Sequence, residues 1–218
     1  MCGRFLLSSD VEELLERYRA IKGWNDTESI RRGRPRRAAV QESFLPPMPP
    51  ETFPSETAPV ITGGPVRELR QMKWGFVSPY VKGLVINARG ETAAAKPMFR
   101  EALKLRRCIV PANAYFEWKR DGKKAVKYRI SHKDQPIFSM AGIYGDFADK
   151  DGSTFTAFSI LTTPPNRILA EIHDRMPLIL PREAEEIWLD CRITDPAELK
   201  SLLKPYDEEG KYLEMAIA

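Results

Sequence analysis

Beyond about residue 66, the chain consists largely of short apolar-rich segments separated by polar and turn-forming residues, a pattern that predicts β-strands rather than long helices. Segments rich in Val, Ile, Phe, Tyr and Thr are separated by Gly, Asp and Pro, as expected of strands joined by turns. The predicted strands span residues 67–74, 83–87, 108–118, 125–131, 136–145 and 154–162.

Helical spacing is confined to shorter segments. The capping box Ser9-Asp10-Val11-Glu12 precedes apolar residues at helical intervals, which predicts a helix that ends near Gly23. Further helices are predicted over residues 91–106, 166–172, 181–189 and 195–204. Because strands follow one another without a regular βαβα alternation, the pattern favours an α+β fold with a mostly antiparallel sheet.

Residues 24–59 differ from the rest of the chain. Seven of the 18 prolines lie there, and five arginines fall between Arg31 and Arg37. This composition predicts a long Pro/Arg-rich loop within a single domain spanning residues 1–218. The arginines suit either phosphate contacts or a solvated loop.

Composition excludes several classes of protein. The chain has 218 residues, a net charge of +4 and a pI of about 8.9, which is compatible with a polyanionic partner. No apolar run approaches the length of a membrane span. The three cysteines, Cys2, Cys108 and Cys191, are widely spaced, which disfavours a disulfide framework and a zinc site and favours a cytoplasmic protein. We expect Cys108 and Cys191 to be buried, and we expect no metal or organic cofactor.

Cys2 is the residue with the most unusual chemistry. If Met1 is removed, Cys2 carries an α-amine and a thiol on adjacent carbons. Such a pair traps an aldehyde first as an imine and then as a five-membered thiazolidine. The alternative is that Cys2 is an incidental residue at a frayed terminus.

Three further residues are candidates for proton transfer or positioning. Glu117 lies among aromatic residues in Tyr115-Phe116-Glu117-Trp118, where burial would raise its pKa, unless its face of the strand meets solvent. His173 lies between a predicted short helix and a proline-led segment, and it is either an acid/base group or a surface histidine. His132 is predicted to be exposed and to have no role in the chemistry. Asn87 ends an apolar strand, where it can orient a ligand or form a turn.

Two motifs suggest contacts with nucleic acid. Arg89, in Asn87-Ala88-Arg89-Gly90-Glu91, can bind a phosphate through both guanidinium nitrogens. The aromatic residues of Trp74-Gly75-Phe76 can stack on unpaired bases, although core packing is the commoner role of such residues.

Taken together, these motifs give a more specific prediction. Met1-Cys2-Gly3-Arg4-Phe5, Trp74-Gly75, residues 87–91, residues 115–118 and His173-Asp174-Arg175-Met176-Pro177 occur in the order and approximate spacing of one family. The chain resembles the SOS response-associated peptidase (SRAP) family, whose members crosslink to abasic sites in single-stranded DNA. The resemblance extends from residue 1 to about residue 190 and implies a twisted sheet closed into a pseudo-barrel with peripheral helices.

The resemblance also implies roles for individual residues. Cys2 would form a thiazolidine with the aldehyde of the ring-opened abasic sugar, and Asn87 would position it. Glu117 and His173 would move protons, with His173 as the acid that opens the sugar ring. The implied DNA contacts are Arg4, Trp74, Phe76, Arg89 and Arg175. The implied partner is abasic single-stranded DNA. One lesion-sized site needs no second subunit, so we expect a monomer, and we expect it to associate with the nucleoid when DNA is damaged.

Other activities remain open from the sequence. A Cys2–His173 pair would suit a cysteine peptidase, although self-removal of Met1 also accounts for the family name. A chain without catalytic function could bind single strands through Arg31–Arg37, and an amine without its thiol would act as an abasic-site lyase. The chain departs from the family's Tyr-Asn-(Ile/Val)-Ala-Pro stretch, for which the nearest match is Thr52-Phe53-Pro54-Ser55.

Overall fold

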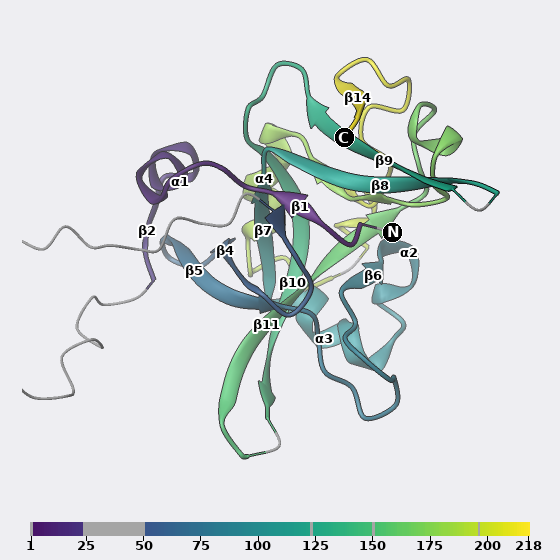
Figure 1. Ribbon diagram of the computed structural model, residues 1–218. Coiled ribbons are helices and arrows are strands. Elements are labelled where there is room, and N and C mark those ends of the chain that lie inside the picture. Colours follow the sequence, from purple (N-terminus) through teal and green to yellow (C-terminus); the bar gives the residue numbers. More distant parts are fainter. Residues whose placement is uncertain (1, 24–50, 123, 150, 196) are drawn as a thin grey trace, which may run out of the picture.

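The computed structural model describes residues 2–23, 51–122, 124–149, 151–195 and 197–218. Five strands form the centre of the molecule: β4 (Thr57–Thr62), β5 (Arg67–Trp74), β7 (Arg107–Ala112), β10 (Phe138–Ala148) and β11 (Thr154–Thr163). Each pairs antiparallel with the next in the order β5-β4-β7-β10-β11, and β11 then pairs in parallel with β5. This last pairing closes the sheet into a barrel and confirms the predicted α+β pseudo-barrel (Figure 1).

A second sheet lies beside the barrel and carries the N-terminal strand. Its order is β14-β9-β8-β1-β3, and each pairing is antiparallel. Its strands are β1 (Phe5–Leu6), β3 (Glu51–Thr52), β8 (Ala114–Asp121), β9 (Lys124–His132) and β14 (Leu213–Ile217). Phe5 pairs with Tyr115, which brings the start of the chain against the middle of β8.

Further short strands pair with strands of the barrel. They are β2 (Ala20–Lys22), β6 (Asn87–Arg89), β12 (Met176–Pro177) and β13 (Ile179–Leu180). β6 runs parallel to β11, with Asn87 opposite Ile160. This pairing matters for the site because it holds Asn87, the first residue of β6, against a rigid barrel strand.

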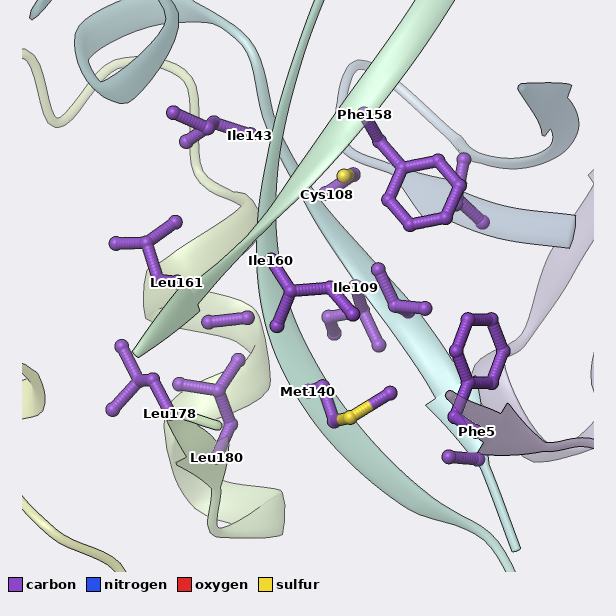
Figure 2. Close-up of a cluster of buried hydrophobic side chains, with 14 of the residues drawn as sticks. Phe5, Cys108, Ile109, Met140, Ile143, Phe158, Ile160, Leu161, Leu178 and Leu180 are labelled. Carbon is purple, nitrogen blue, oxygen red and sulfur yellow. The ribbon is translucent and has the colours of Figure 1, made fainter. Parts of the chain in front are cut away.

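Buried side chains of the barrel strands fill the core. Figure 2 shows Ile109, Met140, Ile160 and Leu180 converging from different strands, with Phe5 of β1 at one edge. Cys108 belongs to this cluster and is fully buried, as predicted. Cys191, in contrast, is exposed, because it lies in a turn after the helix that ends at Leu189.

In the described part of the chain, four short α-helices lie around the sheets: α1 (Val11–Tyr18), α2 (Gly90–Ala93), α3 (Pro97–Leu105) and α4 (Arg182–Leu189). α1 begins as predicted, although Asp10 provides the cap by accepting the Glu13 N–H. It ends at Tyr18 rather than near Gly23, since Arg19 adopts a left-handed conformation and β2 then pairs with β5. No helix in the described ranges is long and apolar enough to cross a membrane.

Several other predicted elements differ from the structure. The segment 108–118 is two strands in different sheets, and most of 83–87 is irregular, with one bridge at Val85. The predicted helices at 166–172 and 195–204 reduce to single 3-10 turns, η2 (Leu169–Glu171) and η3 (Lys200–Leu202). Residues 24–50, including Arg31–Arg37, lie outside the described residues, and the end of the predicted loop instead forms β3 and the start of β4.

Candidate active site

Cys2 is buried at the junction of the two sheets. Its side chain is fully inaccessible to solvent, and its thiol donates a hydrogen bond to the Arg4 carbonyl oxygen at 3.6 Å. Burial, together with the nearby charge of Glu117, raises the pKa of the Cys2 thiol well above its ordinary value. Cys2 is therefore held in a defined position as a neutral thiol and is not part of a frayed terminus.

Asn87 connects the N-terminal segment to the barrel. Its side-chain Nδ2 donates a hydrogen bond to the Cys2 carbonyl oxygen at 2.8 Å. Its Oδ1 is buried and has no hydrogen-bond partner among the described residues. Because β6 is fixed by its pairing with β11, the amide anchors Cys2 to a rigid element and keeps one acceptor available.

Glu117 provides an ionisable group with an unusual pKa. It lies in the middle of β8, and only 2% of its surface is exposed. Burial raises the pKa of Glu117 to about 7. A carboxyl with that pKa exists in both protonation states near neutral pH, so it can donate a proton in one step and accept one in another.

His173 follows the 3-10 turn η2. Its Nδ1 accepts the backbone N–H of Arg175 at 3.0 Å and lies 2.8 Å from Oδ1 of Asp174. Burial lowers the pKa of His173 below its ordinary value, so the imidazole is neutral near pH 7. A neutral imidazole accepts protons more readily than it donates them, which differs from the acid role expected from the sequence.

Glu117 and His173 line the same cleft although they are far apart in the sequence. The cleft has a volume of about 450 Å³, and its other lining residues are Trp118, Arg120, Ile172 and Asp174. β8 supplies one wall and the segment after η2 supplies the other. The structure therefore brings two acid/base groups to one solvent-accessible space, and the charge of Glu117 reaches the buried Cys2.

Arg175 does not have the free guanidinium expected of a phosphate contact. Its Nη1 and Nη2 bind both carboxylate oxygens of Glu91 at 2.6 and 2.8 Å, and Nη2 also donates to the Thr162 carbonyl oxygen. These hydrogen bonds from Arg175 lower the pKa of Glu91. The pair ties the segment that carries His173 to α2 and β11, so Arg175 has a positioning role instead.

Trp74 and Phe76 are likewise unavailable to a nucleic acid. Trp74 is fully buried, packs against Phe5 and Phe158, and donates its indole N–H to the Ile86 carbonyl oxygen at 3.0 Å. Phe76 is buried against Phe147. Neither ring offers a face to a base, so the prediction that they line a DNA groove is wrong and core packing accounts for both.

Arg4 and Arg89 remain accessible near Cys2. The Arg4 guanidinium lies over the rings of Phe53 and Trp118 and contacts Glu51 at 3.1 Å. Arg89 is exposed immediately before α2. Both cations therefore lie next to elements that hold the site residues.

The structure also corrects the prediction for His132. The side chain is buried, its Nε2 lies 2.8 Å from the Tyr206 hydroxyl, and its ring stacks on Tyr212. His132 thus anchors the segment that leads into β14. Sequence inspection missed this role because the tyrosines lie more than 70 residues away along the chain.

Comparisons with known proteins identify related sequences and a related fold. The family model for SOS response associated peptidase (SRAP) matches residues 1–216. The chain is 36% identical to the abasic site processing protein YoqW of Bacillus subtilis, over 96% of this chain and 89% of the relative. It is 40% identical to the abasic site processing protein YedK of Escherichia coli, over 56% of this chain and 54% of the relative. A crystal structure of a Bacteroides thetaiotaomicron protein superposes with a TM-score of 0.80 at 32% identity, covering 99% of this chain and 91% of that protein.

Proposed function

This chain belongs to the SOS response associated peptidase (SRAP) family, and we propose that it processes abasic sites in single-stranded DNA by covalent capture on Cys2. The names of its relatives support abasic-site processing. The observation that carries the proposal is the arrangement of a buried Cys2, anchored by Asn87, beside a carboxyl whose pKa is about 7.

The reaction needs Cys2 as the first residue. Hydrolysis of the Met1–Cys2 bond, by the protein itself or by a separate aminopeptidase, would release the α-amine. That amine has an ordinary pKa of roughly 7.7–8.0, so a useful fraction is neutral near pH 7. The buried oxygen Oδ1 of Asn87 is suited to accept a hydrogen bond from it.

Sugar ring opening is the first chemical step. A closed abasic sugar is a hemiacetal, which opens when its hydroxyl loses a proton and its ring oxygen gains one. Neutral His173 is suited to accept the hydroxyl proton, and protonated Glu117 is suited to supply the proton to the ring oxygen. The product is the free aldehyde, and the step involves no oxidation or reduction.

Capture then takes place at the aldehyde carbon. The Cys2 amine adds to the carbon, and loss of one water leaves an imine. The thiol transfers its proton to ionised Glu117, sulfur bonds to the imine carbon, and the ring nitrogen gains a proton. Holding these groups around one carbon contributes roughly 7–11 kcal/mol to lowering the barrier.

DNA binding is expected to involve the accessible groups around the cleft. Arg4 and Arg89 are positioned for phosphates, and the half-buried Trp118 lines the cleft, where it offers a ring for base stacking. Binding that depends on phosphate contacts weakens as salt rises and has little sequence preference. Selectivity for the lesion would come from the aldehyde. One such site requires no second subunit, so we propose that the protein acts as a monomer.

The main alternative activities are less well supported. A cysteine peptidase needs a thiol paired with its base, whereas the Cys2 thiol donates its hydrogen bond to the Arg4 carbonyl oxygen. A protein that only binds DNA needs no acid/base chemistry, so it would not require a buried carboxyl beside a cysteine. Lyase chemistry is a secondary activity of the same site, because the imine alone permits β-elimination. In that case Cys2→Ala would cleave abasic DNA without retaining it.

A denaturing gel tests the proposal. Protein whose intact mass shows Cys2 at its N-terminus is incubated with a single-stranded oligonucleotide that contains one abasic site. We expect a slow-migrating band that is absent with undamaged DNA and with Cys2→Ala. If protein that begins with Cys2 gives no such band, the proposed capture is wrong.

A further inference from the structure

The Tyr115 hydroxyl is a buried polar group in the site region that the proposed reaction leaves unused. Tyr115 lies on β8, its side chain is fully buried, and its hydroxyl has no hydrogen-bond partner among the described residues. Its ring packs edge-on against Phe138 at a centroid distance of 6.3 Å. Phenylalanine would make the same ring contact without burying an unpaired hydroxyl, which is costly.

The position of Tyr115 places it close to the reacting groups. Tyr115 and Glu117 are two residues apart on one strand, so their side chains project from the same face of β8. Tyr115 pairs with Phe5, and the next residue, Phe116, donates its N–H to the Arg4 carbonyl oxygen at 2.9 Å. That carbonyl is also the acceptor of the Cys2 thiol proton.

Electrostatics support the same arrangement. Burial, together with the charges that Cys2 and Glu117 carry when ionised, raises the pKa of Tyr115 well above its ordinary value. The phenol therefore stays protonated throughout the neutral range. It can donate a hydrogen bond there but does not act as a base.

The hydrogen bond of Cys2 changes when its thiol ionises. The neutral thiol donates to the Arg4 carbonyl oxygen, whereas a thiolate has no proton to donate and is repelled by that oxygen. The sulfur then needs a donor in its buried surroundings. A protonated hydroxyl without a partner in the resting protein meets this need without breaking an existing bond.

We propose that the Tyr115 hydroxyl donates a hydrogen bond to the Cys2 sulfur as it becomes a thiolate and closes the thiazolidine ring. This inference rests on the proposed function. In the step, the thiol proton moves to ionised Glu117, the sulfur–carbon bond forms, and the imine π electrons move onto nitrogen, which takes up the proton held by Glu117. The Tyr115 O–H bond remains intact, so the residue stabilises charge and transfers no proton.

The test compares Tyr115→Phe with the wild type on abasic single-stranded DNA. Borohydride reduces the imine to a stable amine and leaves the closed thiazolidine unchanged. Samples of the reaction that are treated with borohydride at successive times therefore report how much imine and how much thiazolidine is present, which separates the rate of imine formation from the rate of ring closure. We expect Tyr115→Phe to form the imine normally and to close the ring roughly tenfold more slowly. The pH dependence of closure should move upward by about one unit, because a tenfold change corresponds to one pKa unit.

Stability provides a second readout. Tyr115→Phe should unfold at the same temperature as the wild type or a higher one, since it removes an unpaired hydroxyl. The matched control is Tyr18→Phe, because the buried Tyr18 hydroxyl bonds with the Ser139 hydroxyl at 3.0 Å. This control should lose stability and keep the wild-type rate of closure.

Two results would count against the inference. If Tyr115→Phe closes the ring at the wild-type rate with an unchanged pH profile, the hydroxyl has no role in closure and only the inference fails. If the wild type forms neither imine nor thiazolidine, the proposed function fails together with the inference.

Discussion

The side-chain amide of Asn87 donates a hydrogen bond of 2.8 Å to the backbone carbonyl oxygen of Cys2. This contact joins the start of the chain to a strand paired with the barrel. Figure 1 shows the first described residues close to β6. A nucleophile on a terminal segment would otherwise sample many positions, and the amide restricts it to one.

Asn87→Ala should impair both capture and stability. The substitution leaves the buried Cys2 carbonyl without its donor, which costs about 1–3 kcal/mol in the free energy of unfolding. Capture should slow as well, because the N-terminal residue loses its anchor. Urea unfolding and gel-based capture rates measure the two effects.

The control for this prediction is Trp188→Phe. The Trp188 indole N–H also donates a hydrogen bond to a buried backbone carbonyl, that of Cys108 at 2.9 Å, and Trp188 is not among the residues that line the cleft. It should lose stability while the folded protein captures DNA normally. If Asn87→Ala captures at the rate of this control, Asn87 has no positioning role.

Glu117→Gln should slow capture by roughly 10²–10⁴-fold, the usual contribution of a general acid or base. Glutamine has nearly the same size and does not titrate. The wild-type pH–rate profile should contain an ionisation at about 7, which this variant lacks. Retention of that ionisation in Glu117→Gln would assign it to another group.

The raised pKa of Glu117 also predicts how stability depends on pH. The pKa of Glu117 is about 7 in the folded protein and about 4.5 without the effects of the fold. The folded state therefore binds the proton more tightly, and its free energy of unfolding decreases as pH rises from about 4.5 to about 7. Above that range the contribution of Glu117 is constant.

Glu117→Gln should remove that decrease. Urea unfolding at about pH 5 and about pH 8 gives, for each protein, the difference in the free energy of unfolding between the two pH values. We expect a larger loss of stability in the wild type than in the variant. Equal losses would mean that Glu117 titrates normally in the folded state.

Arg89 and Arg175 should respond differently to replacement by alanine. Arg89→Ala should weaken binding of undamaged single strands with little change in stability. The slope of the logarithm of the binding constant against the logarithm of the salt concentration should become shallower by about 0.7.

Arg175→Ala should lose about 2–3 kcal/mol in the free energy of unfolding. This loss is smaller than that expected from breaking a fully buried ion pair, because the Glu91 side chain is 40% exposed. Binding titrations at several salt concentrations distinguish the two. A reduced salt slope in folded Arg175→Ala would restore Arg175 as a phosphate contact.

Four of the longer strands were largely predictable from the sequence. β5, β9, β10 and β11 match their predicted ranges closely, because Gly, Asp or Pro residues lie close to both ends of each. α4 was predictable too, with Pro181 at its start. These elements carry their own local signals.

Breaks between elements depended on weaker signals or on distant partners. The predicted helix over residues 91–106 is interrupted because Lys96, which precedes Pro97, is extended. The strand over 108–118 divides at Asn113, whose side chain accepts the Ser8 N–H and donates to the Pro136 carbonyl oxygen. Nothing near Asn113 in the sequence indicates either partner.

The site was predictable in its residue types and less so in their roles. Cys2, Asn87 and Glu117 could be singled out from their chemistry and motifs. The sequence could not show that Arg175 pairs with a carboxylate instead of binding a phosphate, because its partner Glu91 is 84 residues away. The burial of Trp74 follows from barrel closure between β5 and β11, a long-range pairing that alternation does not reveal.

The mass of the isolated adduct is the most direct test of covalent capture by Cys2. Wild-type protein that begins with Cys2 is reacted with an abasic oligonucleotide, and the denatured adduct is weighed intact and mapped after digestion. We predict a mass equal to protein plus oligonucleotide minus one water, with the modification on the peptide that begins at Cys2. An adduct mapped to any other residue, or the same adduct formed by Cys2→Ala, would contradict this account.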